Sequence, residues 1–240
     1  MMGEDKEENT MEGKKIMKTV TFSYDDGVTQ DQRLIDLFDK YGVKCTFNLN
    51  SGKAESGGPM TCNNVTVAHV KPRLDEIPRI YRGHEVAVHT LTHPSLTTLP
   101  DEEVIREVEE DRKILSDIVG EEVVGMAYPN GAVDARVVRL IRENTGVLYS
   151  RTTVSTHDFQ PQTELLTFHP TVHHTEWETM FALARQFVEM QPESQQLFYI
   201  WGHAYEFDVD DSWDRFEEFL KLISGRDDIR YCTNREAFGL

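Results

Sequence analysis

The sequence predicts a single α/β domain with a mainly parallel sheet. Runs rich in β-branched and aromatic residues alternate with amphipathic segments of about ten to twenty residues, the order expected of parallel βαβ units. The length of 240 residues suits one domain, and no internal repeat or Pro/Gly/Ser-rich linker divides it. About seven or eight such units would form either a closed barrel or an open, doubly wound sheet.

The first half of the chain supplies three predicted strands and the clearest helices. The residues MKTVTFSY favour a strand, and the amphipathic segment that follows has Gly42 as its expected C-cap. In the longest helical segment, acidic residues crowd the first turn, apolar residues recur at helical spacing and Gly120 ends the pattern. The predicted order is strand 17–24, helix 31–42, strand 43–50, loop 51–67, a helix within 72–82, strand 84–89 and helix 100–120.

The second half continues the alternation with shorter strands. β-branched and aromatic residues predict each strand, and Gly146 marks the expected end of one helix. The predicted order is strand 123–129, helix 133–145, strand 147–150, strand 165–169, helix 176–190, strand 196–203, helix 211–224, strand 229–233 and a short helix from Asn234.

The charge of the chain disfavours several classes of partner. A formal net charge of −17 gives a surface that repels nucleic acid and anionic membranes, because phosphate binding needs clustered Lys and Arg. No stretch reaches the ~18 apolar residues that a membrane helix needs. We therefore expect no nucleic-acid or membrane partner, and a neutral or cationic ligand fits better than a strongly anionic polymer.

The N-terminal segment and the cysteines bear on the cellular compartment. The first eighteen residues are charged and contain no apolar run, so they do not resemble a secretory signal. We predict a disordered tail over 1–17 and one folded domain over 18–240. Three cysteines at irregular spacing form no disulfide framework, which favours a reducing, cytoplasmic location. If a signal had been removed ahead of this start, the protein would be secreted instead.

Polar residues gather where four predicted strands end. The carboxyl ends of parallel strands meet at one mouth of a barrel, where functional groups lie. Two histidines four residues apart can face one point if the chain turns helically there, and a carboxylate from another strand would complete a metal-binding set. Two imidazoles and a carboxylate suit Zn, Co, Ni, Mn or Fe(II) and leave positions open for water and substrate. The four groups are Asp25-Asp26-Gly27, His89 with His93, Tyr128-Pro129-Asn130-Gly131, and Gly202-His203.

These four groups resemble the motifs of the polysaccharide deacetylase family (carbohydrate esterase family 4, the NodB homology domain). TFSYDDG (21–27) resembles the family's T-F-D-D-G motif, and HTLTH (89–93) matches its H-[ST]-x-x-H motif. AYPNG (127–131) is similar to its R-x-P-[FY]-G motif, and YIWGH (199–203) lies where the family has a late L-x-H motif. The resemblance covers roughly residues 18–235.

The resemblance implies a distorted (β/α) barrel with about seven parallel strands. It implies that Asp26, His89 and His93 bind one divalent transition metal ion, zinc first, with Co²⁺, Ni²⁺, Mn²⁺ or Fe²⁺ as alternatives. It also implies that Asp25 is the general base and that His203 protonates the leaving amine. The implied reaction removes N-acetyl or O-acetyl groups from a sugar, oligosaccharide or glycan, and it needs both a carbonyl-polarising ion and groups that move protons.

Three features depart from the family pattern. Ala127 stands where the family has the arginine that orients the base, and Asn130 stands where it has an aromatic residue. The family's D-x-x-D-W segment, which orients the acid histidine, has no clear match. We expect Arg151, just past a strand end, to replace the missing arginine, and Asp158-Phe159 is a candidate for the missing Asp-Trp.

Other residues are candidates for contacts to substrate. The backbone N–H of Asn130 is expected to support the oxyanion, and Trp201 either stacks on a sugar ring or packs in the core. The loop that carries His169, His173 and His174 is interpreted as lining the cleft or lying on the surface, rather than as a second metal site. The full set of substrate and oxyanion candidates is Tyr128, Pro129, Asn130, Arg151 and Trp201.

Two alternatives to glycan deacetylation stay open. A hydrolase of cyclic amides or ureides, similar to allantoinase, would keep the metal site and change the substrate. A carbohydrate-binding protein without catalysis would have lost the proton-transfer groups. A nucleotide-binding protein is disfavoured, because no glycine-rich phosphate loop follows a strand. The expected partner is a carbohydrate or a small amide, and the oligomeric state is left open.

Overall fold

The structure, a computed structural model, describes residues 16–240. The strands are β1 (Lys18–Asp25), β2 (Cys45–Leu49), β3 (Gly57–Cys62), β4 (Val65–Val70), β5 (Glu85–Val88), β6 (Gly125–Ala127), β7 (Tyr149–Arg151), β8 (Val172–His173), β9 (Gln196–His203) and β10 (Ile229–Tyr231). The α-helices are α1 (Asp31–Tyr41), α2 (Ile77–Ile80), α3 (Asp101–Val119), α4 (Ala135–Asn144), α5 (Trp177–Glu189), α6 (Glu206–Val209), α7 (Trp213–Ile223) and α8 (Asn234–Phe238).

Seven parallel strands form the body of the sheet, in the order β7-β6-β5-β2-β1-β9-β8, and β10 pairs with the first half of β1. Strand β1 pairs with β9 along its whole length and with β2 along its second half. Beyond β7, Phe168 donates its N–H to the carbonyl of Ser150 (2.9 Å) and Thr171 donates to Tyr199 of β9 (2.8 Å). The sheet therefore curls into an open half-barrel, which confirms the expected distorted (β/α) barrel.

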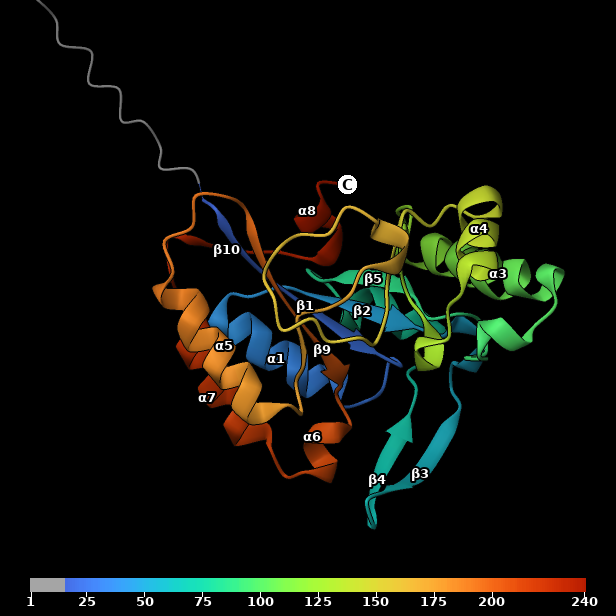
Figure 1. Ribbon diagram of the computed structural model, residues 1–240. Helices are drawn as coiled ribbons and strands as arrows, with labels where there is room; N and C mark the ends of the chain where they lie inside the picture. Colours follow the sequence, from blue (N-terminus) through green and yellow to red (C-terminus); the bar gives the residue numbers. More distant parts are fainter. Residues whose placement is uncertain (1–15) are drawn as a thin grey trace, which may run out of the picture.

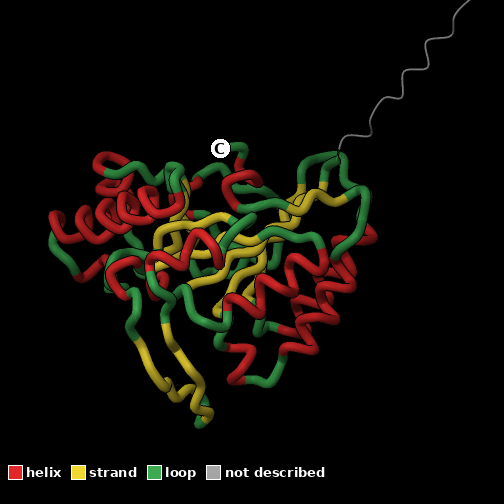
Figure 2. Tube along the Cα trace, turned by 180° about the vertical axis from the view of Figure 1, so that it is seen from behind, coloured by secondary structure: helices red, strands yellow, loops and turns green. Residues whose placement is uncertain are grey.

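Helices cover the outside of the curled sheet (Figure 1). Helices α1, α5 and α7 pack together against one part and α3 with α4 against another, and the view from behind shows the strands between these groups (Figure 2). The amphipathic pattern accounts for α1, because Leu34, Ile35 and Phe38 are buried on its inner face. The ring of Phe38 lies 4.9 Å from that of Phe22 in β1. Burying each such side chain contributes about 1.5–3 kcal/mol, so these faces hold the helices on the sheet.

The loop predicted over 51–67 is wrong in its second half. Strands β3 and β4 form an antiparallel hairpin there, which projects from the body of the domain (Figure 1). Its turn is Asn63-Asn64, both with positive φ (50° and 63°), which is the backbone that two-residue hairpin turns require and that Asn tolerates. The hairpin matters because β4 leads the chain back to the carboxyl ends of the parallel strands. His69 lies near the end of β4, and Lys71 follows it.

The strand predicted over 165–169 is also wrong. Residues Leu165–Thr167 form a 3-10 turn, and Phe168 makes only an isolated bridge to Arg151. The strand that pairs with β9 is the later β8. Pro170 explains the break, since proline has no N–H to give to a ladder.

The sequence also led to expectations about the N-terminal tail, the cysteines and membrane-spanning helices. Residues 1–15 of the tail predicted over 1–17 lie outside the described residues, and β1 begins at Lys18. The three cysteines all lie in the described part of the chain, and each is free. Between residues 16 and 240, no helix combines the length and the apolar character needed to cross a membrane.

Candidate active site

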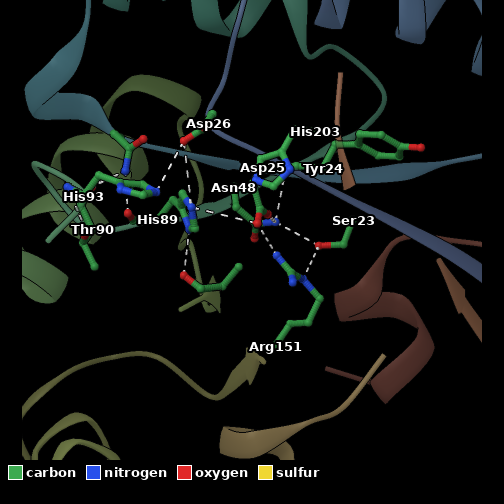
Figure 3. Close-up of polar contacts among 12 residues, drawn as sticks. Ser23, Tyr24, Asp25, Asp26, Asn48, His89, Thr90, His93, Arg151 and His203 are labelled. Atoms are coloured by element: carbon green, nitrogen blue, oxygen red, sulfur yellow. Dashed lines mark hydrogen bonds and ion pairs between the residues drawn. The ribbon is translucent and has the colours of Figure 1, made fainter. Parts of the chain in front are cut away.

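Five strand ends bring polar side chains together at one mouth of the sheet. Asp25 closes β1, and in register beside it lie Asn48 of β2 and His203 of β9. The end of β5 leads directly into His89, and β7 ends at Arg151. Figure 3 shows these side chains around one point. The expectation that the carboxyl ends of parallel strands share a mouth therefore holds for this chain.

Asp26, His89 and His93 form a group that fits one metal ion. Their ligand atoms lie within 4.8 Å of one another. The carboxylate Oδ1 of Asp26 lies 3.6 Å from His93 Nε2 and 4.0 Å from His89 Nε2. Ligand bonds of about 2.0–2.2 Å place donor atoms roughly 3.0–3.5 Å apart, so a small inward movement would seat an ion. Two imidazoles and a carboxylate suit a divalent transition metal.

The two histidines are held in the form that a ligand needs. His89 Nδ1 lies 2.8 Å from the carbonyl oxygen of Ala127, so Nδ1 carries the proton and Nε2 presents its lone pair to Asp26. Burial lowers the pKa of His89 to about 4, although the nearby carboxylates Asp25 and Asp26 act to raise it. Burial also lowers the pKa of His93. Both rings are therefore neutral at pH 7, as metal ligands must be.

The backbone around these ligands is bent into left-handed conformations. Asp26 has φ of 81°, Gly27 of 61°, and Thr90 and His93 each of 65°. Thr90 Oγ1 accepts the His93 N–H at 3.1 Å and closes the turn between the two histidines. Left-handed conformations at non-glycine residues are costly and gather at functional sites, so the bends are a mark of the site.

Gly27→Ala is expected to destabilise the fold more than Gly42→Ala. Both glycines have a left-handed φ (61° and 64°), so each substitution carries a backbone strain of about 1–2 kcal/mol. A Cβ on Gly27 would also lie 2.6 Å from Leu49 Cδ2, whereas one on Gly42 meets nothing within 4 Å. Such crowding costs about 1–3 kcal/mol more. Urea unfolding of the two variants measures the difference, and equal losses would contradict the crowding argument.

Asp25 is a buried carboxylate with two polar partners. Arg151 Nη2 donates to its Oδ2 in an ion pair, and Asn48 Nδ2 donates to its Oδ1 at 2.8 Å. Burial would raise the pKa of Asp25, but the charges of Arg151 and His203 and the hydrogen bond from Arg151 outweigh it and hold the pKa below its ordinary value. The carboxylate is therefore ionised at neutral pH and able to accept a proton.

The expected contact between Arg151 and Asp25 is present, and its origin is visible in the sheet. Ala127 and Arg151 are register partners on the neighbouring strands β6 and β7. Arg151 is 1% exposed, and its guanidinium lies 4.2 Å from the ring centre of Trp201. Its Nη1 donates to the carbonyl of Thr152 at 2.9 Å. The cation thus reaches Asp25 from β7, the strand beside β6, which carries Ala127.

The comparison with known families decides the identity of the domain. A sequence model of the polysaccharide deacetylase family matches residues 12–149, more than half of the chain. The chain belongs to the polysaccharide deacetylase family. A model of glycosyl hydrolase family 57 matches residues 82–219, a range that holds His89 and His93 but neither Asp25 nor Asp26.

Curated relatives of this polysaccharide deacetylase family member are longer proteins. Chitin deacetylase 1 of Cryptococcus neoformans var. grubii is 31% identical over 116 residues, which are 48% of this chain and 22% of the relative. A peptidoglycan-N-acetylglucosamine deacetylase of Listeria monocytogenes is 28% identical over 149 residues, 61% of this chain and 28% of that protein. The chain thus spans between 22% and 28% of the length of these relatives.

Solved structures share the fold over nearly the whole domain. The Xyl-CE4 domain of a multidomain xylanase from the hindgut metagenome of Trinervitermes trinervoides has a TM-score of 0.58 at 19% identity, covering 92% of this chain and 90% of that one. A family 4 carbohydrate esterase from Streptomyces lividans, in complex with acetate, has a TM-score of 0.55 at 16% identity and covers 90% and 91%. At these identities the likeness concerns the polysaccharide deacetylase fold alone.

His203 of this family member is oriented by a residue that sequence reasoning missed. Its Nδ1 lies 3.2 Å from Glu206 Oε2, and its backbone N–H donates to the same oxygen at 2.9 Å. Burial would lower the pKa of His203, but Glu206 and the active-site carboxylates outweigh it and raise the pKa to about 9. The imidazolium form therefore dominates at neutral pH, with Nε2 left for a substrate.

The suggestion that Asp158-Phe159 replaces the missing Asp-Trp is wrong. Asp158 is exposed, and its carboxylate accepts the N–H of Phe159 at 2.7 Å, so it caps its own loop. Phe159 is buried against Phe187 and Phe198. The signal that could have pointed to Glu206 is its position three residues after His203, at the start of α6, where a turn returns the side chain to the strand end.

The third motif contributes less to the site than the sequence suggested. The Tyr128 side chain is buried and donates to the carbonyl of Leu166 at 2.8 Å, so it is a core residue, and Pro129 is buried beside it. Asn130 is exposed, with φ of 56°, and its side chain donates to Ser95 Oγ at 3.2 Å. Trp201 is 7% exposed and packs under Arg151, so it supports the base and offers no open face to a sugar ring.

Two more residues at the metal group come from the unpredicted hairpin. His69 Nε2 lies 3.3 Å from Asp26 Oδ2, and Lys71 Nζ donates to the Asp26 backbone carbonyl and lies 3.7 Å from its carboxylate. Burial would raise the pKa of Asp26, but the hydrogen bond with His69 and the charge of Lys71 lower it. Asp26 is therefore held ionised, as a metal ligand requires.

Proposed function

We propose that this protein is a metal-dependent deacetylase that removes acetyl groups from an N-acetylated carbohydrate. One observation carries the proposal: the ligand group Asp26, His89 and His93 lies beside an ionised carboxylate, Asp25, and a protonated imidazole, His203. Hydrolysis of an amide needs all three elements, because the carbonyl is a weak electrophile and the amine is a poor leaving group.

Asp26, His89 and His93 would hold the ion, and we propose zinc, with Co²⁺, Ni²⁺, Mn²⁺ or Fe²⁺ as alternatives that the same donors accept. When bound there, a divalent ion would polarise the acetyl carbonyl and lower the pKa of water. Asp25 accepts the proton of the attacking water, because its carboxylate is ionised and held by Arg151 and Asn48.

His203 supplies the second proton transfer. Its Nδ1 is held by Glu206, which leaves Nε2 as the acidic nitrogen that faces the site. A pKa of about 9 keeps it protonated at pH 7, so it can deliver a proton to the departing nitrogen. The backbone N–H of Asn130, at the rim, is our proposed support for the oxyanion.

The substrate class follows from the relatives and the charge. Two curated relatives are named for chitin and for peptidoglycan N-acetylglucosamine. We therefore propose a polymer or oligomer of N-acetylglucosamine for this chain. The product is a primary amine, which is cationic at neutral pH and compatible with a net charge of −17.

The two carboxylates at the metal group do not supply the acid for glycoside hydrolysis, the activity suggested by the second family match. That reaction needs one carboxyl group kept protonated as an acid. The pKa values of both Asp25 and Asp26 lie below the ordinary value, so neither serves as that acid. A protein that only binds carbohydrate is disfavoured by the ion pair between Asp25 and Arg151, since it restores a base-orienting contact that binding alone does not use.

A substrate panel tests the proposal. The protein, loaded with zinc, is incubated with chitin oligomers, peptidoglycan fragments, acetylated xylan and allantoin, and acetate or ring-opened product is measured. Acetate from the N-acetylated substrates supports the proposal. Turnover of allantoin alone would establish the ureide alternative, and no turnover with tight sugar binding would establish the non-catalytic one.

Arg151→Ala is expected to lower kcat/KM by about 10–100-fold, the usual cost of losing the partner of a catalytic group. Without the guanidinium the pKa of Asp25 rises, because burial is no longer outweighed. The base is active above its pKa, so the acidic limb of the pH profile moves to higher pH. Adding Ala127→Arg, on the register partner of Arg151, should move the limb back. An acidic limb that stays in place in Arg151→Ala would contradict this role.

A further inference from the structure

One carboxylate in the structure lies among three imidazole rings. Glu206 Oε2 lies 3.4 Å from His173 Nε2, 3.2 Å from His174 Nε2 and 3.2 Å from His203 Nδ1. The histidines come from β8, from the residue after it and from the end of β9, which are neighbouring strands. The sequence favoured a loop here that lines the cleft or lies on the surface, and not a second metal site. His169 lies apart from the group, with its Nδ1 on Thr152 Oγ1.

The ring orientations are fixed by hydrogen bonds on the far side of each imidazole. His173 Nδ1 lies 2.7 Å from Thr175 Oγ1, and His174 Nδ1 lies 3.0 Å from the Tyr24 hydroxyl. His173 and His174 therefore turn their Nε2 atoms toward Glu206, whereas His203 presents its Nδ1. A polar partner on the second nitrogen is also what fixes the tautomer of metal-binding histidines.

Hydrogen bonding accounts for the contact of His203 with Glu206 but not for that of His174. His174 is fully buried, and its Nε2 makes no hydrogen bond although it lies 3.2 Å from the Glu206 oxygen. A buried imidazole nitrogen left without a partner costs free energy. A buried imidazole nitrogen that lies beside a carboxylate oxygen without an N–H···O bond to it is an arrangement found near a bound cation.

The spacing and access fit an ion as well. The ligand atoms of His173, His203 and Glu206 all lie within 4.8 Å of one another. The separations of 3.2 and 3.4 Å from the Glu206 oxygen match the roughly 3.0–3.5 Å between donors on one ion. These three side chains are 16–21% exposed, so an ion can enter from solvent.

We propose that His173, His203 and Glu206 form a second divalent transition-metal site, with His174 behind it, and that filling this site inhibits the enzyme. Binding replaces the Nδ1 proton of His203, which passes to solvent, and breaks its hydrogen bond to Glu206. Because this proton must be displaced, the affinity of the second site for the ion is lower than that of the site formed by Asp26, His89 and His93. The inhibition rests on the proposed function, because metal binding would remove His203 as the group that protonates the leaving amine. The binding of the second ion does not depend on the proposed function.

Zinc binding to the full chain tests the inference. Equilibrium dialysis against increasing free Zn²⁺ should show two ions per wild-type chain, one tight and one weak. His173→Gln should lose the weak ion, and Asp26→Ala should lose the tight one. His157→Gln is the matched control, since His157 is an exposed histidine on a nearby loop that pairs with Glu176. Circular dichroism confirms that each variant is folded.

The outcomes separate this inference from the proposed function. Acetate release by wild type should fall as the second ion binds, and His173→Gln should resist excess zinc relative to its own rate at one zinc per chain. One ion per wild-type chain at every zinc concentration overturns the second site, as does a weak ion that survives His173→Gln. Two ions per chain at high zinc, with no acetate release even at one zinc per chain, would leave the second site standing and refute the deacetylase proposal.

Discussion

Asp26→Ala is expected to abolish metal binding and acetate release together, whereas Asp25→Asn keeps the metal and loses most of its turnover. The two carboxylates are adjacent in sequence but face different partners. Asp26 Oδ1 faces His93 Nε2 at 3.6 Å, while Asp25 is held by Arg151 and Asn48. Removing a ligand lowers the affinity for the ion directly, and removing a general base costs about 10²–10⁴ in rate.

Metal content after dialysis and acetate release from chitin oligomers measure the two effects on the same samples. Asp158→Asn is a suitable control, because Asp158 is an exposed aspartate that caps its own loop. Its variant should match wild type in both measurements. If Asp25→Asn lost the metal while Asp26→Ala kept it, the two roles would be exchanged.

His203→Gln is expected to retain the tight metal and to slow amide hydrolysis by about 10²–10⁴, with a much smaller loss on an activated acetate ester. An amine leaves only when protonated, whereas a good alcohol leaving group does not need the proton. Chitin oligomers and p-nitrophenyl acetate are compared at one zinc per chain. Equal losses on both substrates would make His203 a positioning residue and not the acid.

The same role fixes the alkaline side of the pH profile. The acid must be protonated, so activity is present below the pKa of His203, about 9, and is lost as pH rises through it. Glu206→Gln removes the negative charge that raises this pKa and leaves only a neutral acceptor for the Nδ1 proton. The alkaline limb should therefore move to lower pH in that variant, while the acidic limb, set by Asp25, stays where it is.

The metal group was predictable because it depends on short-range geometry. Strand ends set Asp26 and His89, and the spacing of His93 from His89 matched the family motif. The helical turn expected between the two histidines is absent, because Thr90 and His93 both have a positive φ of 65°. Arg151 was predictable for a related reason, since neighbouring parallel strands present their ends at the same mouth. Its register partner is Ala127, the position at which the family resemblance implied an arginine.

The errors arose where the outcome depends on tertiary contacts or on a turn that was not recognised. Asn63-Asn64 forms a hairpin turn without the usual glycine, so β4 and its contact to Asp26 were missed. Tyr128 follows the end of β6, but its hydroxyl finds the Leu166 carbonyl in the core. Glu206 was missed because Asp158-Phe159 resembles the Asp-Trp pair of the family motif and was favoured for that reason. The turn after β9 decides instead which carboxylate contacts His203.

Acetate release by chelated protein during a zinc titration tests the central claim most directly. The apoprotein is titrated with Zn²⁺ in the presence of N-acetylglucosamine oligomers, and acetate and bound zinc are measured together. The account predicts no acetate without metal and a rate that rises in proportion to bound zinc up to one ion per chain. Acetate release that is indifferent to chelation, or none from a chain that holds one zinc at Asp26, His89 and His93, would contradict it.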